Sequence, residues 1–273
     1  DDHRVAMTFS LSSFFHPGDE KKSKRILEIN NPKCVNKTFP HFFQELTKIC
    51  SNAIPVITID GPTASGKGTI ARLVADFLGF ELLDSGIFYR SLALLSGFNK
   101  INENDETSLA KFARNLNIKV KGKKVFYSNM DITEGIREEK IGILASKISV
   151  FPLVRRALLR CQRDFANLPG LVADGRDMGS VVFPNAKLRV FLTANQKIRA
   201  ERRYKQLIQK EIPCTLKDIL QDIVDRDSRD NNRKISSLNL AKNKSTIIID
   251  SSLKSIDQVV REIINEFKKP HFD

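Results

Sequence analysis

The segment Gly61-Pro-Thr-Ala-Ser-Gly-Lys-Gly-Thr69 decides which fold is expected for this chain of 273 residues. It follows a run of strand-forming residues, Pro55-Val-Ile-Thr-Ile59, and precedes a stretch with helical period, Ile70–Leu78. Strand, glycine-rich turn and helix open a βαβ unit, and GxxxxGK in that context is typical of a phosphate-binding loop. The glycines let successive backbone N–H groups face phosphate oxygens, and the helix N-terminus adds its dipole. The segment therefore predicts an α/β protein that binds phosphate groups.

The two residues at the end of the loop set its charge and its metal chemistry. Lys67 is expected to reach the β- and γ-phosphates of a nucleotide as a point charge. The Ser or Thr that usually follows this Lys is Gly68 here, and the hydroxyl comes one place later, at Thr69. Gly-Lys-Gly-Thr is similar to the loop of nucleoside monophosphate kinases, in which water and a distant Asp do more of the coordination of Mg²⁺.

The rest of the chain continues the α/β pattern. Buried strands are predicted at Leu171–Ala173, Leu188–Leu192 and Thr246–Ile249, each followed by a polar turn and a helical stretch. That order is typical of a parallel sheet covered by helices. Ile118–Ser128 instead alternates polar and apolar residues around a glycine turn, which predicts a β-hairpin inserted between helices.

Composition limits the classes of protein that fit. Lys and Arg number 45 against 32 Asp and Glu, a net charge of +13, which is a weak sign of anionic partners and more often only a solvated basic surface. No run approaches the ~18 apolar residues of a membrane span, and no targeting segment is expected. The cysteines lie far apart and form no CxxC pair, which favours a reducing cytoplasm; they are Cys34, Cys50, Cys161 and Cys214. Cys161 lies on the apolar stripe of a helix that Pro152 can start, so it is interpreted as a core residue.

Three further motifs follow the loop in a fixed order. They are Leu-Leu-Asp-Ser-Gly-Ile-Phe-Tyr-Arg at 82–90, Val-Ala-Asp-Gly-Arg-Asp-Met-Gly at 172–179, and Asp-Arg-Asp-Ser-Arg-Asp-Asn-Asn-Arg at 225–233. With the loop at 61–69 they resemble the bacterial type of cytidylate kinase over about residues 54–273. The resemblance implies a P-loop NTPase core with the nucleoside monophosphate kinase fold, a parallel sheet flanked by helices. It also implies a small β-containing insert that binds the monophosphate, at about 100–140, and an Arg-rich lid at about 202–234.

The resemblance further implies an activity: transfer of the γ-phosphoryl group of ATP, with Mg²⁺, to CMP or dCMP in pyrimidine nucleotide metabolism. A cytoplasmic monomer that binds these small nucleotides, no membrane and no specific nucleic acid is expected. The residues expected to bind ATP are Gly61, Pro62, Thr63, Ala64, Ser65, Gly66, Lys67, Gly68 and Thr69. Those expected to bind CMP are Ser85, Tyr89, Arg90, Ser146, Arg155, Arg176, Asp177, Arg226 and Asp230. The catalytic cations would be Lys67, Arg176, Arg226, Arg229 and Arg233, and the metal would be held by Asp174 through water, with Thr69 as a further candidate.

The implied roles make chemical sense. Planar guanidinium groups match phosphate oxygens in pairs, which suits the arginines to the acceptor phosphate. A carboxylate at Asp177 would accept from the exocyclic amine of cytosine and would repel the oxygen that uracil presents there. Ser146 and Arg155 would read the rest of the base edge. No general base is needed, because the attacking oxygen belongs to a phosphate that is already anionic.

Each motif taken alone has a plainer interpretation. An Arg beside an Asp is most often a surface ion pair, and 225–233 is compatible with a solvated helix face carrying i,i+4 pairs. Asp84 can cap a turn instead of contacting substrate. The alternative functions are another small-molecule P-loop kinase, acting on UMP or shikimate, and a non-catalytic basic protein that binds nucleic acid. A shikimate kinase has a shorter lid and would not need the hairpin, and a nucleic-acid binder would show steep salt dependence.

Residues 1–52 belong to a different pattern. Asp-Asp-His-Arg-Val-Ala-Met at 1–7 and Cys-Val-Asn-Lys-Thr-Phe-Pro-His-Phe-Phe-Gln-Glu-Leu at 34–46 resemble the C-terminal end of 5-enolpyruvylshikimate-3-phosphate synthase. In that family the residues that correspond to Arg4 and Lys37 contact substrate. We expect an α–β–α segment and linker at 1–52, the remnant of a fusion, and a kinase domain at 53–273. No synthase activity is expected, because that active site needs residues from both synthase domains.

Overall fold

The chain forms two compact units, residues 1–53 and residues 54–273, in the computed structural model. The described residues are Arg4, Met7, Thr38, Phe39, Phe42 and the ranges 54–122, 124–209, 211–231 and 246–269. In the first unit Arg4 is helical, and the rings of Phe39 and Phe42 meet edge to face with their centroids 5.8 Å apart. The α–β–α pattern expected there, and Lys37 with it, lies outside the described residues.

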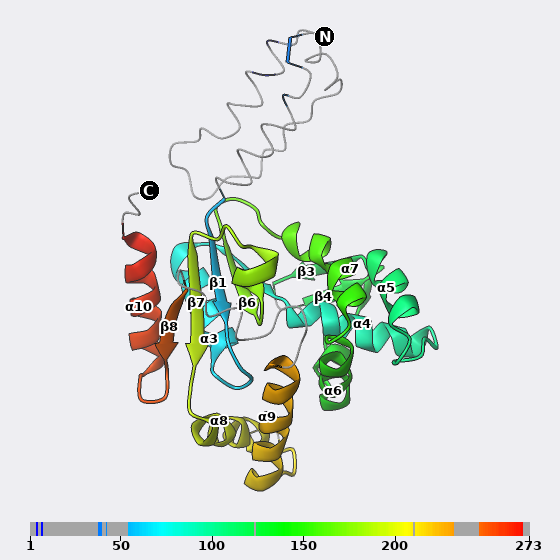
Figure 1. Cartoon of the computed structure of the whole chain (residues 1–273), viewed down its shortest axis with the longest axis vertical. Coiled ribbons are helices and arrows are strands. Elements are labelled where there is room, and N and C mark those ends of the chain that lie inside the picture. The colour runs from blue at the N-terminus through cyan, green and yellow to red at the C-terminus, as the bar shows by residue number, and fades with distance from the viewer. Residues whose placement is uncertain are drawn as a thin grey trace. The chain divides into compact units, whose positions relative to one another are not determined.

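The second unit is built on a five-stranded parallel sheet in the order β2-β6-β1-β7-β8 (Figure 1). The strands are β1 Val56–Asp60, β2 Glu81–Asp84, β6 Leu171–Gly175, β7 Leu188–Thr193 and β8 Ile247–Asp250. The helices are α3 Lys67–Leu78, α4 Gly86–Phe98, α5 Glu106–Arg114, α6 Glu139–Ile148, α7 Pro152–Arg163, α8 Gln196–Ile208, α9 Leu216–Asn231 and α10 Ile256–Lys268. The parallel sheet predicted from the sequence is confirmed, and within the described ranges no helix has the length and apolar character to cross a membrane.

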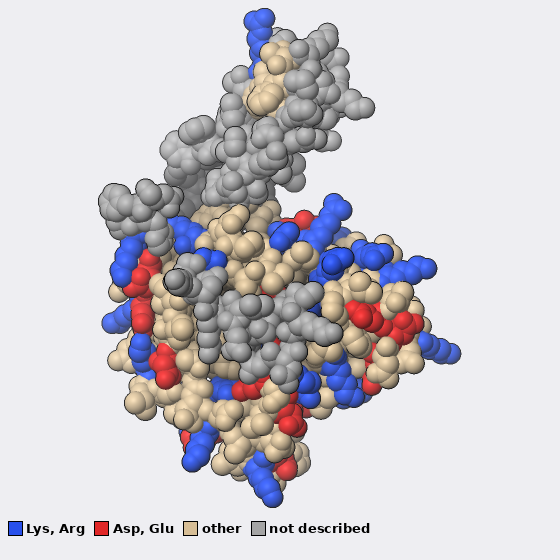
Figure 2. Space-filling model, in the orientation of Figure 1, with Lys and Arg blue, Asp and Glu red and all other residues tan. Residues whose placement is uncertain are grey.

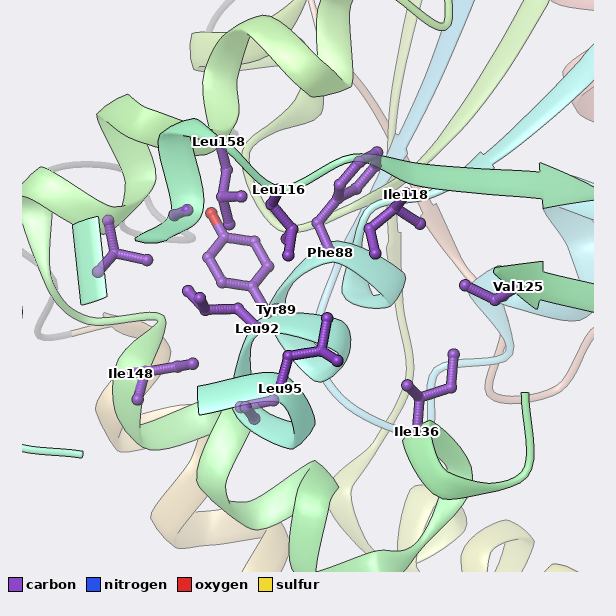
Figure 3. Close-up of a cluster of buried hydrophobic side chains, with 14 of the residues drawn as sticks. Phe88, Tyr89, Leu92, Leu95, Leu116, Ile118, Val125, Ile136, Ile148 and Leu158 are labelled. Carbon is purple, nitrogen blue, oxygen red and sulfur yellow. The ribbon is translucent and has the colours of Figure 1, made fainter. Parts of the chain in front are cut away.

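Helices cover both faces of this sheet. Neighbouring residues of β6 alternate between two apolar clusters, because successive side chains of a strand point to opposite faces. Leu171 and Ala173 pack with residues of α4, α5, α6 and α7, whereas Val172 packs with residues of α3 and α10. Figure 3 shows Phe88 and Leu92 of α4 converging in the larger cluster with Leu158 of α7. Burial on both faces explains why the strands are almost continuously apolar.

A separate three-stranded antiparallel sheet follows α5. Its strands are β3 Ile118–Lys121, β4 Lys124–Tyr127 and β5 Met130–Asp131. The predicted hairpin is confirmed, since Ile118 pairs with Tyr127 and Val120 with Val125. The third strand is an addition that the sequence pattern did not predict.

The strand and helix ends position the site. Parallel strands end at one edge of the sheet, so the residues after β1, β2 and β6 are brought together there. Asp60, Asp84 and Asp174 all lie at this edge, and Asp84 is directly beside Asp174 in the register of β2 and β6. Helix α7 begins at Pro152 as expected, and Cys161 is a half-buried free thiol packed against the larger cluster.

Candidate active site

The loop after β1 forms the floor of the site. At Gly61, where φ is 154°, a Cβ atom would lie 2.0 Å from the carbonyl oxygen of Leu192, so only glycine fits. The loop then enters α3, and no side chain caps the N-terminus of that helix. Lys67 is the first residue of α3; its side chain is 8% exposed and its Nζ donates to the Pro62 carbonyl oxygen at 3.0 Å. Uncapped N–H groups and a buried ammonium group therefore meet at one place, which suits an anion.

A pocket of about 310 Å³ opens beside Lys67. All the residues predicted to bind the monophosphate line it, and they come from α4, α6, α7, α9 and the turn after β6: Ser85, Tyr89, Arg90, Ser146, Arg155, Arg176, Asp177, Arg226 and Asp230. Thr63, Ala64 and Asp174 line it as well. Lining residues that the sequence did not single out are Gly86, Gly142, Ala145, Ser149 and Gly175, and Asp84, for which a turn cap was the expected role. Residues from the phosphate loop, from the end of β6 and from four helices thus converge.

Two of the predicted catalytic arginines are not among the described residues that line this pocket. Arg229 is absent from the described lining, and its Nε atom is buried without a hydrogen-bond partner among the described residues. Arg233 lies outside the described residues. Their assignment from the family pattern remains a prediction.

The arginines of the pocket are already paired with carboxylates. The pairs are Arg90 with Asp84 at 2.7 Å, Arg155 with Asp177, Arg176 with Asp230 at 2.8 Å, and Arg226 with Asp222 at 3.0 Å and Glu139 at 3.2 Å. The turn cap expected at Asp84 is confirmed, because this carboxylate also accepts from the Gly86 N–H at 2.9 Å. The i,i+4 interpretation holds for Arg226 and Asp222, yet Arg226 also lines the pocket.

Arg155 and Asp177 form the buried wall of the pocket. The two side chains are 8% and 6% exposed, and the guanidinium of Arg155 also donates to the Ser149 carbonyl oxygen at 2.9 Å. Its central carbon lies 5.6 Å from the centroid of the Tyr89 ring. Burial works to lower the pKa of Arg155, but the net direction is upward because Tyr89 and Asp177 lie beside it. The pair is therefore held rigidly at a fixed place in the site.

Burial sets the ionisation of the central groups. Desolvation, followed by the neighbouring charge of Arg176, lowers the pKa of Lys67 to about 8. Desolvation raises the pKa of Asp174 to about 6, and Lys67 works against that rise. Both shifts record the cost of burying charged groups, and burial also strengthens their interaction with an incoming phosphate.

Asp60, the last residue of β1, is a buried carboxylate that sequence reasoning missed. It is 2% exposed and accepts from the N–H groups of Met178 and Gly179, each at 2.8 Å. Desolvation raises the pKa of Asp60 to about 7 although both hydrogen bonds lower it, and Asp177 and Asp174 add to the rise. An acidic residue before a glycine loop ordinarily reads as part of an exposed turn, so no local signal marked it.

The raised pKa of Asp60 predicts a pH dependence of stability. Because the folded pKa lies above the unfolded value, this group's stabilising contribution is complete below about pH 4 and is lost as pH rises through about 7. Urea unfolding of the wild type and of Asp60→Asn at pH 5 and pH 8 measures it, since the Asn variant does not titrate. The wild type should lose stability relative to the variant at pH 8. A difference that stays constant with pH would contradict the prediction.

The helices α8 and α9 are anchored to the loop by the buried Arg199. Arg199, 3% exposed, donates to the Thr63 carbonyl oxygen at 3.0 Å and to Asp227 at 2.6 Å. Arg202 is half-buried and donates to the Ser251 carbonyl oxygen at 2.7 Å and to the Ser251 hydroxyl at 3.1 Å. A second pocket of about 280 Å³ lies on this side of the loop; its lining includes Ser65, Gly66, Thr69, Arg202, Ser251, Lys254 and Ile256. The charged pattern of α8 reads as a solvated helix, which hid the role of Arg199.

Comparison with known proteins agrees with this geometry. The profile of the family described as cytidylate kinase matches residues 57–269. The cytidylate kinase of Polynucleobacter asymbioticus is 49% identical over 217 residues, which cover 80% of this chain and 98% of that protein. The cytidylate kinase of Ralstonia pickettii is 48% identical over 215 residues, which cover 79% of this chain and 92% of that protein. That of Cupriavidus pinatubonensis is 49% identical over 214 residues, which cover 78% of this chain and 96% of that protein. With most of its length matched by the family profile and by relatives spanned almost end to end, the chain belongs to the cytidylate kinase family.

Proposed function

We propose that this protein transfers the γ-phosphoryl group of ATP to CMP or dCMP, giving ADP and CDP or dCDP. The observation that carries the proposal is that three groups line one pocket. They are the ammonium group of Lys67 in the phosphate loop, the guanidinium group of Arg176, which suits phosphate, and the buried carboxylate of Asp177. Membership of the cytidylate kinase family supports it.

The acceptor end of the pocket suits a cytosine base. Asp177 supplies an acceptor for the exocyclic amine, and its partner Arg155 supplies donors for the carbonyl edge, while Ser146 lines the same wall. Uracil would place an oxygen against the Asp177 carboxylate, which is repulsive. We therefore assign discrimination between CMP and UMP to Asp177.

The donor nucleotide fits the other side of the loop. The second pocket adjoins the phosphate loop at Ala64, Ser65 and Gly66, and it is lined largely by apolar atoms between α8 and α10. A nucleoside whose phosphates lie on the loop could place its base there, beside Arg202. We assign this pocket to the adenosine part of ATP.

Mg²⁺ fits the edge of the loop beside Asp174. The Oδ2 atom of Asp174 lies 3.2 Å from where a Cβ of Gly68 would be, so a Ser or Thr at 68 would crowd this carboxylate. Asp84, Asp174 and Thr69 line one shallow space there. Among the described residues no group of three or more His, Cys, Asp or Glu could hold an ion, which suits a metal that keeps most of its waters. When bound, Mg²⁺ would neutralise charge on the β- and γ-phosphates.

The protein's part in the transfer is alignment and charge neutralisation. Lys67 and Arg176 would hold the transferring group, and Arg90 and Arg226 would hold the acceptor phosphate from α4 and α9. No residue is asked to remove a proton, since the attacking phosphate oxygen is already anionic. Closure of α8 and α9 over the nucleotides would exclude water, which would otherwise accept the phosphoryl group.

The proposal is tested by a coupled assay of ADP release with CMP, dCMP, UMP, AMP and shikimate as acceptors. CMP and dCMP should give the highest kcat/KM. A higher value with UMP or shikimate would favour another small-molecule kinase. Figure 2 shows basic and acidic side chains interspersed over the described part of one face, which gives little support to the nucleic-acid alternative. Steeply salt-dependent binding to long DNA or RNA, without ADP release, would revive it.

The remaining assignments rest on the family pattern. We propose an acceptor insert at about 100–140, a lid at about 202–234 and a monomeric enzyme that works in the cytoplasm, where both nucleotides are found. We also propose that residues 1–52 are a remnant of a synthase C-terminus without synthase activity.

Truncation tests that division of the chain. Every residue assigned above to a nucleotide lies after Asn52, so deletion of Asp1–Asn52 should leave the kcat and KM for CMP nearly unchanged, with at most a modest fall in thermal midpoint. The measurement compares activity and thermal unfolding of the truncated and full chains. A large drop in turnover would mean that the N-terminal unit supports the kinase site.

A further inference from the structure

The carboxylate of Asp60 lies beneath the pocket without lining it. From the end of β1 it reaches the short helical turn Met178–Val182. Each of its two carboxylate oxygens accepts one hydrogen bond, from the N–H group of Met178 or from that of Gly179. The turn sits directly on β1, because a Cβ at Gly179 would lie 2.6 Å from the Thr58 hydroxyl oxygen. Asp60 thus ties the strand that begins the phosphate loop to the turn that follows the base-reading residue.

The residue in the N-cap position of that turn is Asp177. An aspartate there ordinarily accepts from the N–H groups of its own first turn, and that is the main reason for its preference at N-caps. The Asp177 side chain makes no such bond and pairs with Arg155 at the pocket wall instead. One of the N–H groups that it would otherwise satisfy, that of Gly179, is taken by Asp60, which also accepts from the N–H of Met178.

We propose that Asp60 is a positioning residue for base selection: by capping the turn in place of Asp177, it keeps the Asp177 carboxylate directed to the cytosine edge. Asp60 contacts neither substrate. When the cap is weakened, an orphaned N–H group competes for the Asp177 carboxylate and draws it out of the pocket. The inference rests on the proposed role of Asp177 in discriminating CMP from UMP.

One rival explanation has to be separated. Asp60 directly precedes Gly61, so its loss could disturb the phosphate loop instead of the turn. A disturbed loop would raise the KM for ATP, whereas a displaced Asp177 raises the KM for CMP. A general loss of packing would lower kcat/KM for CMP and UMP by the same factor and leave their ratio unchanged.

The test is Asp60→Asn in the full chain, a variant of the same size that retains one acceptor but turns an amide NH₂ toward the second N–H group. The ratio of kcat/KM for CMP to that for UMP should fall by roughly threefold to tenfold, the range expected for one ordinary hydrogen bond. KM for CMP should rise, and KM for ATP should stay within about twofold. Ile57→Val on the same strand is the matched control, because Ile57 is equally buried but packs in the cluster with α3 and α10, and it should leave the ratio unchanged.

Combination with Asp177→Asn completes the test. If Asp60 acts through Asp177, then Asp60→Asn should not lower the ratio further in the Asp177→Asn background. An unchanged ratio in the single Asp60 variant, a rise confined to the KM for ATP, or a further fall in the double variant would each overturn the proposal. If Asp177→Asn alone leaves the ratio unchanged, the proposed role of Asp177 fails first, and the positioning role of Asp60 fails with it. A fall for Asp177→Asn but not for Asp60→Asn rejects only the latter.

Discussion

Lys67→Ala should reduce kcat for phosphoryl transfer to CMP by roughly a hundredfold to a thousandfold or more, the loss seen when a preorganised charge is removed from a developing anion. In the proposed mechanism Lys67 is the cation that the loop presents to the β- and γ-phosphates, and Arg176 is tied to Asp230 and Thr63 and is not free to move into its place. The side chain is buried, so the ammonium group acts where water screens it little.

The same variant should remain folded. Burial lowers the pKa of Lys67, which means that the folded state holds this charge at a cost, and its removal relieves that cost. The measurement is steady-state ADP release with the thermal midpoint determined beside it, and Lys111→Ala on the exposed face of α5 is the matched control. Turnover near the wild-type value in a folded Lys67→Ala protein would refute the proposed kinase mechanism.

Asp177→Asn should lose discrimination between CMP and UMP by about 1–3 kcal/mol, the size of a good polar contact to a base edge. The amide that replaces the carboxylate can donate to uracil as readily as it accepts from cytosine, so the repulsive element is lost together with the attractive one. The change should appear mainly as a rise in kcat/KM for UMP relative to CMP, measured with both acceptors at fixed ATP.

The structural role of Asp177 requires a control. Its carboxylate forms an ion pair with Arg155. The substitution therefore removes the negative charge that pairs with this buried guanidinium, and it is expected to lower the thermal midpoint. A loss of stability alone cannot change the ratio of kcat/KM for CMP to that for UMP, because the same folded molecules act on both acceptors. An unchanged CMP-to-UMP ratio with a lowered midpoint would assign Asp177 a purely structural role, and that role would be to hold Arg155.

Local patterns were enough to predict the strands β1, β6, β7 and β8 and the β3–β4 hairpin. Each is marked by apolar runs or alternation within a few residues, bounded by turn residues. The edge strand β2 was missed, because Leu82 and Leu83 make too short an apolar run and its pairing with β6 is set by residues far along the chain. The pocket lining was predicted only through the family resemblance, since the bonds that gather it span long separations.

Asp60 and Arg199 show where sequence reasoning stopped. Charged side chains are almost never buried without partners, so each reads as solvent-exposed from the sequence. Their partners lie 118 residues away for Asp60 and Met178 and 136 residues away for Arg199 and Thr63. Nothing within a turn or a helical repeat encodes such a contact, and it appears only once the strands and α8 are placed around the loop.

The ion pairs of Arg90, Arg176 and Arg226, the arginines proposed to hold phosphate, have a consequence for how the affinity for substrate depends on salt. A phosphate that enters the pocket exchanges one oxyanion for another, and the protein's own carboxylates are the counter-ions released. Few dissolved anions are displaced, so the affinity for CMP should fall less steeply with ionic strength than the number of arginines would imply. In this respect the pocket resembles an ion-exchange resin whose fixed cations already carry counter-ions, the counter-ions here being the protein's own carboxylates.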